Sequence, residues 1–93
     1  MLNKEQIETI KQTIGKYPTN QIGIFGSYAR NEENENSDLD ILISFKNNIN
    51  LLQLLDLENQ LSDKLGIKVE LITEHALHPK IKPYVFKDLK IVE

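Results

Sequence analysis

Residues 21–45 read QIGIFGSYARNEENENSDLDILISF, two apolar segments joined by a polar connection. The first segment, Gln21 to Phe25, is short and rich in isoleucine, which predicts a buried strand that ends at Gly26-Ser27. The second segment, Asp38 to Phe45, alternates between apolar and other side chains, which predicts a strand with one core face and an acidic end on its other face. The residues on the predicted core face are Leu39, Ile41, Ile43 and Phe45.

A capping pattern at the N-terminal side predicts a helix before these strands. Asn3 can accept a hydrogen bond from the backbone of Gln6, whose side chain can reach back, and Gly15 suits the end of the helix. Apolar residues recur between them at helical spacing, at Ile7, Ile10 and Ile14.

The same device recurs after the second strand. Asn50 and Gln53 predict a second helix start, and Gly66 predicts its end. Five leucines form an apolar stripe along this helix, which we interpret as core packing because the helix is of ordinary length. The stripe consists of Leu51, Leu54, Leu57, Leu61 and Leu65.

The remainder of the chain predicts a third strand from Ile67 to Thr73 and a final short strand from Leu89 to Val92. Between them, Pro79 and Pro83 limit any helix to short pieces. This order of elements predicts an α/β (α+β) fold in which helices pack on a mixed sheet. We find no linker or repeat, so we expect one domain over residues 1–93.

The composition is that of an ordinary globular chain, with 93 residues, 40% hydrophobic and 27% charged. The absence of cysteine excludes disulfides, thiolate nucleophiles and cysteine-type zinc sites. No apolar run approaches the roughly 20 residues of a membrane span, and the start of the chain has no apolar signal region. We therefore expect a cytoplasmic protein without membrane association.

Charge is distributed unevenly along the chain, whose net charge is −3. Residues 1–63 carry 5 basic and 10 acidic side chains, whereas residues 64–93 carry 6 and 4. This acidic balance and the absence of an aromatic platform argue against direct nucleic-acid binding. The C-terminal lysines are either a solvated face or a surface for an acidic partner. They are Lys80, Lys82, Lys87 and Lys90.

The residues with the clearest chemical meaning lie at the ends of the first two predicted strands. Gly26 allows close backbone approach to a phosphate, and Ser27 offers a hydroxyl and an N–H for an anion. Asp38 and Asp40 lie two residues apart and project from one face of a strand. Two such carboxylates repel unless they share a cation, and their oxygens suit Mg²⁺ with substrate phosphates.

The segments GSYAR (26–30) and SDLDILI (37–43) resemble the signature of the minimal nucleotidyltransferase (MNT) domain of the DNA polymerase β superfamily. The resemblance extends over nearly the whole chain. It implies that Gly26 and Ser27 hold the terminal phosphates of ATP and that Asp38 and Asp40 bind metal, normally two Mg²⁺ ions. The third carboxylate of the family is implied at Glu70, as metal ligand and as acceptor of the proton from the attacking hydroxyl.

Two positions depart from the family pattern. The third acid is commonly Asp, and Glu70 is one methylene longer; Asn31 stands where glycine is common, although Asn tolerates a positive φ. Arg30 can reach phosphate or can form a salt bridge with the acidic loop that follows it. Glu70 has a corresponding structural alternative, an ion pair with Lys68.

Members of this family are often paired with a HEPN-domain RNase toxin, which they neutralise by adding AMP. The resemblance therefore implies an antitoxin that transfers AMP from ATP to a hydroxyl of such a toxin, a tyrosine in our hypothesis, within a hetero-oligomer. Two alternatives stay open: transfer to a small-molecule acceptor, and a catalytically weak module that neutralises a toxin by contact alone.

Overall fold

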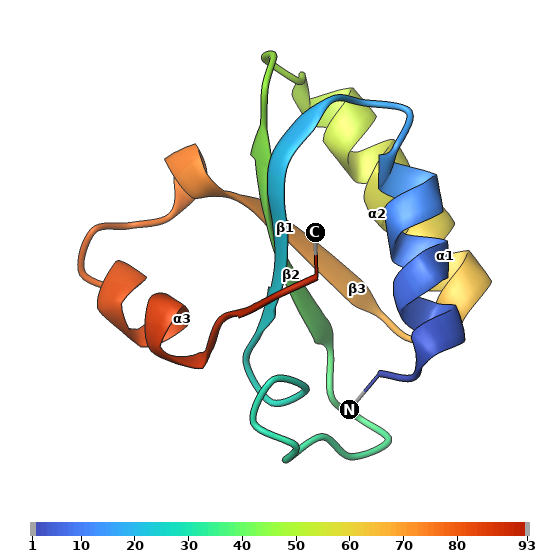
Figure 1. The fold of residues 1–93 in the computed structure, drawn as a ribbon, viewed down its shortest axis with the longest axis vertical. Coiled ribbons are helices and arrows are strands. Elements are labelled where there is room, and N and C mark those ends of the chain that lie inside the picture. Colours follow the sequence, from blue (N-terminus) through green and yellow to red (C-terminus); the bar gives the residue numbers. More distant parts are fainter. Residues whose placement is uncertain (1, 93) are drawn as a thin grey trace.

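The computed structural model describes residues 2–92 and contains three α-helices and a four-stranded sheet (Figure 1). Met1 and Glu93, the ends of the predicted domain, lie outside the described residues. In chain order the elements are α1 (Lys4–Ile14), β1 (Thr19–Phe25), β2 (Leu39–Phe45), α2 (Leu51–Leu65), β3 (Val69–Thr73), the 3₁₀ turn η1 (Glu74–Ala76), α3 (Lys82–Asp88) and β4 (Lys90–Ile91).

The sheet is mixed, as the order of elements predicts. Its strand order is β3-β2-β1-β4, in which β1 runs antiparallel to β2 and to β4. Strands β2 and β3 are parallel because α2 forms the crossover connection between them. Helices α1 and α2 cover one face of the sheet and α3 lies on the other (Figure 1).

Both predicted capping boxes are confirmed. Asn3 accepts from the backbone N–H of Gln6, and the Gln6 side chain accepts from that of Asn3, at 2.8 and 2.9 Å. Asn50 and Gln53 repeat this exchange at the start of α2. The two helix ends differ: Gly66 adopts the left-handed conformation expected of a glycine cap, with φ 68°, but Gly15 stays right-handed, with φ −60°.

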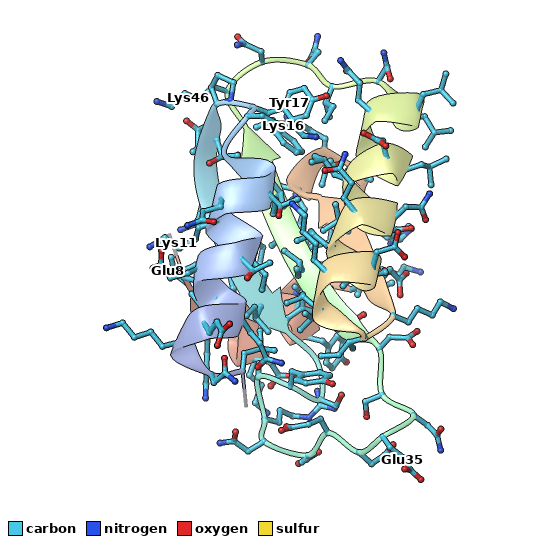
Figure 2. The ribbon with its side chains drawn as sticks, turned by 90° about the vertical axis from the view of Figure 1, so that its right-hand side faces the viewer. Glu8, Lys11, Lys16, Tyr17, Glu35 and Lys46 are labelled. Carbon is cyan, nitrogen blue, oxygen red and sulfur yellow. The ribbon has the colours of Figure 1, made fainter. Side chains whose placement is uncertain are left out.

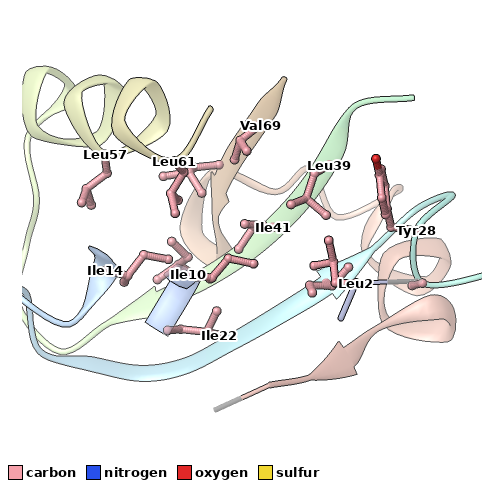
Figure 3. Packing of buried hydrophobic residues seen from close by; sticks show 14 residues of the cluster. Leu2, Ile10, Ile14, Ile22, Tyr28, Leu39, Ile41, Leu57, Leu61 and Val69 are labelled. Atoms are coloured by element: carbon pink, nitrogen blue, oxygen red, sulfur yellow. The ribbon is translucent and has the colours of Figure 1, made fainter. Parts of the chain in front are cut away.

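The main core lies between the sheet and the helices α1 and α2 (Figure 3). Of the predicted leucine stripe, Leu57 and Leu61 are fully buried, and two further members are partly buried against the same cluster. Leu51 differs from the prediction because its side chain is 69% exposed. The largest fully buried side chains are Ile10, Ile14, Ile22, Ile24, Leu39, Ile41, Ile43, Leu57 and Leu61.

Different residues lie at the two ends of the sheet (Figure 2). At one end, Tyr17 packs edge-on against Phe45 with 6.3 Å between ring centroids, and Lys16 donates to Gln60 at 3.1 Å. These contacts tie the α1–β1 turn to β2 and α2. Glu35 and the polar connection between β1 and β2 lie at the opposite end, which is the end that carries the predicted site.

The second face of the sheet has only a small apolar cluster. Leu42, Leu77 and Val85 are buried there, and α3 contacts β1. The segment after α3 packs closely, since a Cβ on Gly23 would lie 2.5 Å from the Leu89 side chain. No helix within residues 2–92 is long and apolar enough to cross a membrane.

Candidate active site

The turn after β1 begins at Gly26, whose φ of 76° is a conformation that other residues rarely adopt. The N–H groups of Ala29 and Arg30 both donate to the Gly26 carbonyl, at 3.1 and 3.2 Å, which forms one helical turn. The N–H groups of Ser27 and the residue after it stand at the open start of this turn. Asn31 has φ 58°, which confirms that Asn replaces glycine at a left-handed position.

Gly26 and Asp40 are in close contact across two strands. Phe25 pairs with Asp40 in the antiparallel register, which brings the Gly26 backbone beside the Asp40 carboxylate. A Cβ on Gly26 would collide with an oxygen of that carboxylate. Glycine is therefore required here for two reasons, its backbone conformation and the space that the acid occupies.

Asp40 also has an acidic neighbour in the adjacent strand. The parallel register of β2 and β3 pairs Asp40 with Glu70, so both carboxylates lie on the sheet face that α1 and α2 leave open. Asp40 is half-buried and Glu70 is exposed. The two acids that the sequence places 30 residues apart are thus side by side.

This arrangement makes the ionised form of Asp40 unfavourable. Burial, followed by the charges of Glu70 and Asp38, raises the pKa of Asp40 to about 6, and the Arg30 charge only partly opposes this rise. A bound cation would relieve the repulsion among these carboxylates. The electrostatics of the site therefore favour a bound positive charge between Asp40 and its acidic neighbours.

Asp38 lies at the edge of this group. It directly precedes β2, and its partly exposed carboxylate lies 4.0 Å from the ammonium of Lys68, whose side chain is exposed. Lys68, the alternative partner for Glu70, thus pairs with Asp38. Across residues 2–92, no three acidic, histidine or cysteine side chains converge as a preformed metal cage.

Arg30 is held by two carboxylates in this structure. Its Nε donates to Glu32 at 3.1 Å and its Nη1 donates to Asp88 at 2.7 Å. Glu32 belongs to the acidic loop that the sequence offered as a salt-bridge partner for Arg30, in place of phosphate. Asp88 was missed because it lies 58 residues away at the end of α3, where no local pattern indicates the contact.

The donor set agrees in kind with a hard divalent cation, since all three candidate ligands are carboxylates. Asp40 and Glu70 are adjacent, and Asp38 lies within electrostatic range of Asp40. The Gly26 backbone lies directly beside the Asp40 carboxylate, with no Cβ between them. The arrangement can hold a cation beside a phosphate group at the edge of the sheet.

Comparison with known proteins places this geometry in context. Residues 8–92 match the protein family described as polymerase beta, nucleotidyltransferase. The protein adenylyltransferase MntA of Thermococcus cleftensis is 36% identical, over 99% of this chain and 98% of that protein. The Methanocaldococcus jannaschii protein MJ1217, provisionally named a protein adenylyltransferase, is 55% identical over 81% of this chain and 74% of its own length.

Solved structures share the fold. A provisionally assigned minimal nucleotidyltransferase superposes with a TM-score of 0.81 at 29% identity, covering 94% of this chain and 89% of the other. A complex of a tri-AMPylated Shewanella oneidensis HEPN toxin with an MNT antitoxin contains a chain that matches with a TM-score of 0.81 at 17% identity. That match covers 99% of this chain and 72% of the other.

Proposed function

The chain belongs to the polymerase beta nucleotidyltransferase family and is a protein adenylyltransferase, and on this basis we propose that it transfers AMP from ATP to a HEPN-domain toxin and so acts as an antitoxin. The proposal treats residues 1–93 as one minimal nucleotidyltransferase domain. The observation that carries it is the contact of Asp40 with both the Gly26 turn and Glu70.

We assign ATP binding to the turn after β1. The absence of a side chain at Gly26 lets the terminal phosphates approach the backbone, and Ser27 supplies a hydroxyl and an N–H at the open start of the turn. Arg30 borders the same turn and is held by Glu32 and Asp88. Its guanidinium adds positive charge near the phosphates, and its ion pairs fix the turn against α3.

We assign the metal site to Asp38, Asp40 and Glu70, which would hold one or two Mg²⁺ ions. Bound Mg²⁺ supplies charge neutralisation for the phosphates of ATP and for the departing pyrophosphate. The raised pKa of Asp40 supports this role because a cation relieves the repulsion that raises it. Asp38 joins the group when its side chain leaves the exposed ion pair with Lys68.

In the proposed reaction, the oxygen of an acceptor hydroxyl attacks the α-phosphorus of ATP. A new phosphorus–oxygen bond forms to the acceptor, the bond to the β-phosphate oxygen breaks, and pyrophosphate leaves. Glu70 takes the hydroxyl proton, since its exposed carboxylate borders the open face beside Asp40. The acceptor hydroxyl in our hypothesis is that of a tyrosine.

A HEPN-domain protein is the first acceptor to test. A chain of the same fold forms a complex with a tri-AMPylated HEPN toxin, although that similarity by itself establishes only the fold. We therefore propose a hetero-oligomer of this chain with its acceptor.

The test is to incubate the protein with a HEPN-domain protein from the same organism, Mg²⁺ and ATP labelled in the α-phosphate, and to weigh both chains by mass spectrometry. We expect AMP on the HEPN protein and loss of its RNase activity. The Asp63→Asn variant is a control, because it removes an exposed carboxylate from α2, which covers the opposite face of the sheet. Its transfer should equal that of the unmodified protein.

Other results would decide for the alternatives. RNase inhibition without any gain in mass would favour neutralisation by contact alone. If labelled AMP reaches small hydroxylated acceptors but not the HEPN protein, the acceptor is a small molecule and the antitoxin assignment is wrong.

A further inference from the structure

The C-terminal segment carries an exposed apolar surface that the proposed chemistry does not use. Helix α3 packs on the open face of the sheet through Val85, which is buried in the small apolar cluster there. The neighbouring large side chains are left in solvent, with Tyr84 74% and Phe86 42% exposed. We call the exposed apolar set of this segment the α3 surface, which consists of Ile81, Tyr84, Phe86 and Ile91.

Lysines alternate along the chain with the residues of the α3 surface. Residues 80–91 contain four of them and a single acidic residue, Asp88, in a chain whose net charge is −3. Asp88 is already engaged, since it accepts a 2.7 Å hydrogen bond from Arg30. Within residues 2–92 these lysines form no ion pair, so their charge faces outward. They are Lys80, Lys82, Lys87 and Lys90.

The α3 surface adjoins the candidate active site. Helix α3 lies on the same side of the sheet as Asp40 and Glu70, opposite α1 and α2 (Figure 1). The ion pair between Arg30 and Asp88 joins the end of α3 to the turn that begins at Gly26. A macromolecule bound on α3 would therefore be held beside the reacting groups.

We propose that the α3 surface docks the protein that receives AMP, through an apolar patch of that protein bordered by acidic side chains. This inference rests on the proposed function and names the part of the chain that selects its acceptor. Large apolar side chains left in solvent are found at protein-binding sites, and aromatic residues contribute much of the binding energy there. Opposite charges at the rim speed the encounter and orient it.

A second exposed apolar group lies on α2 and serves as the comparison. Leu51 and Leu52 are 69% and 78% exposed, yet the helix that carries them covers the opposite face of the sheet. The first turn of α2 holds no charged residue that would select a partner by sign. The α3 surface is favoured because only it combines exposed apolar side chains, unpaired charge and proximity to Asp40.

The test compares Tyr84→Ser and the double variant Lys80→Glu/Lys87→Glu with two controls. Leu52→Ser removes an exposed apolar side chain from α2, and the double variant Lys4→Glu/Lys46→Glu reverses two exposed charges away from α3. All four alter residues on the surface of the molecule, so circular dichroism should show an unchanged fold. Binding to the HEPN-domain protein is measured by calorimetry, and AMP transfer is measured against both acceptor and ATP concentration.

We expect Tyr84→Ser to raise the acceptor Kd and KM about tenfold or more, with unchanged kcat at saturating acceptor and unchanged KM for ATP. The double variant should show a similar loss at low salt and little of the salt dependence of the unmodified protein. The two controls should bind as the unmodified protein does.

Equal acceptor binding by all variants would overturn the inference. The inference would also fail if Tyr84→Ser and the double variant lost only self-association, which would make the surface an interface between copies of this chain. It would fail equally if they lost only binding to single-stranded RNA. Calorimetry measures acceptor binding without AMP transfer, so it distinguishes failure of the docking inference from failure of the proposed function. If the unmodified protein transfers no AMP but binds the HEPN protein through Tyr84, docking holds and the catalytic proposal fails.

Discussion

The two faces of the sheet differ in what covers them and in what they hold. The face under α1 and α2 belongs to a core with nine fully buried aliphatic side chains and almost no polar group. The opposite face has a small apolar cluster under α3 and leaves Asp40 beside Glu70, with a raised pKa. Burial on the covered face therefore supplies most of the stability of the fold. The open face instead brings together carboxylates that repel one another, which does not stabilise the fold.

A large loss of activity is expected when Glu70, the proposed base on the open face, is changed. Glu70→Gln keeps the size and polarity of the side chain but removes the group that takes the proton, which should lower AMP transfer about 10²–10⁴-fold. The side chain is exposed, so the thermal midpoint should stay nearly unchanged. Initial rates with the HEPN acceptor measure the effect, and unimpaired transfer would show that Glu70 is not the base.

Glu70→Asp is the matched variant, since it retains the charge on a side chain one methylene shorter. We expect its transfer rate to stay within about tenfold of the original, a change of roughly 1.4 kcal/mol in the barrier. A loss as large as that of Glu70→Gln would show that the site requires the reach of the side chain as well as its charge.

On the covered face the effect should fall on stability alone. Leu61→Ala removes a fully buried side chain and should lower the free energy of unfolding by about 2–5 kcal/mol. Transfer by the molecules that remain folded should be normal at low temperature. Leu51→Ala, in the exposed first turn of the same helix, should change stability by less than about 0.5 kcal/mol. Urea unfolding measures both variants.

A loss of transfer in folded Leu61→Ala, under conditions where the protein is not unfolded, would break the separation of the two faces. It would mean that packing beneath the sheet sets the positions of the carboxylates above it.

Gly26 and Gly66 give a comparison between two left-handed glycines. An alanine at either position adopts an unfavourable conformation, which costs about 1–2 kcal/mol of stability. At Gly26 the added methyl group also collides with the Asp40 carboxylate, whereas at Gly66 it meets nothing within 4 Å. We expect Gly26→Ala to lose ATP affinity and transfer, and Gly66→Ala to keep both.

Calorimetric titration with ATP and Mg²⁺ measures this difference. Equal ATP binding by the two variants would mean that Gly26 serves only to form the turn.

The fold was predictable because its signals are local. The alternation in β2 and both capping boxes depend on neighbours within a few residues, and they predict the elements that form. The exposure of Leu51 was not predictable, because helical periodicity identifies an apolar face but not how much of that face another element will cover. Gly15 ends α1 as predicted, although its right-handed conformation accepts glycine without requiring it.

The site was predictable only in part. Gly26, Asp38 and Asp40 form a motif within the first strand pair. Glu70 was proposed from the family resemblance, and its position beside Asp40 depends on the parallel register of β2 and β3. The ion pair of Asp38 with Lys68 and that of Arg30 with Asp88 depend on tertiary placement. No pattern of spacing contains that information.

The smallest expected effect is a pH dependence of stability. The pKa of Asp40 rises from 3.8 to about 6 on folding, so the folded state binds more protons than the unfolded state between these values. In metal-free protein this group therefore favours folding less as the pH increases from about 4 to 6. Because Asp40 is half-exposed, we expect the loss to be below about 1 kcal/mol.

Thermal midpoints in the presence of a chelator should show this trend as a difference from Asp40→Asn, in which the contributions of other groups cancel. The variant should become the more stable protein as the pH passes 6. A difference that stays constant from pH 4 to 7 would contradict the electrostatic account of Asp40.

The most direct test of the central claim, that the open face is the catalytic face, measures AMP transfer and thermal stability together in Asp40→Asn. This change removes the charge at the contact between the Gly26 turn and Glu70 while keeping the shape of the side chain. We predict that transfer to the HEPN acceptor is abolished and that the thermal midpoint at neutral pH is unchanged or higher. Transfer at the original rate, or a loss of activity that only follows unfolding, would contradict the claim.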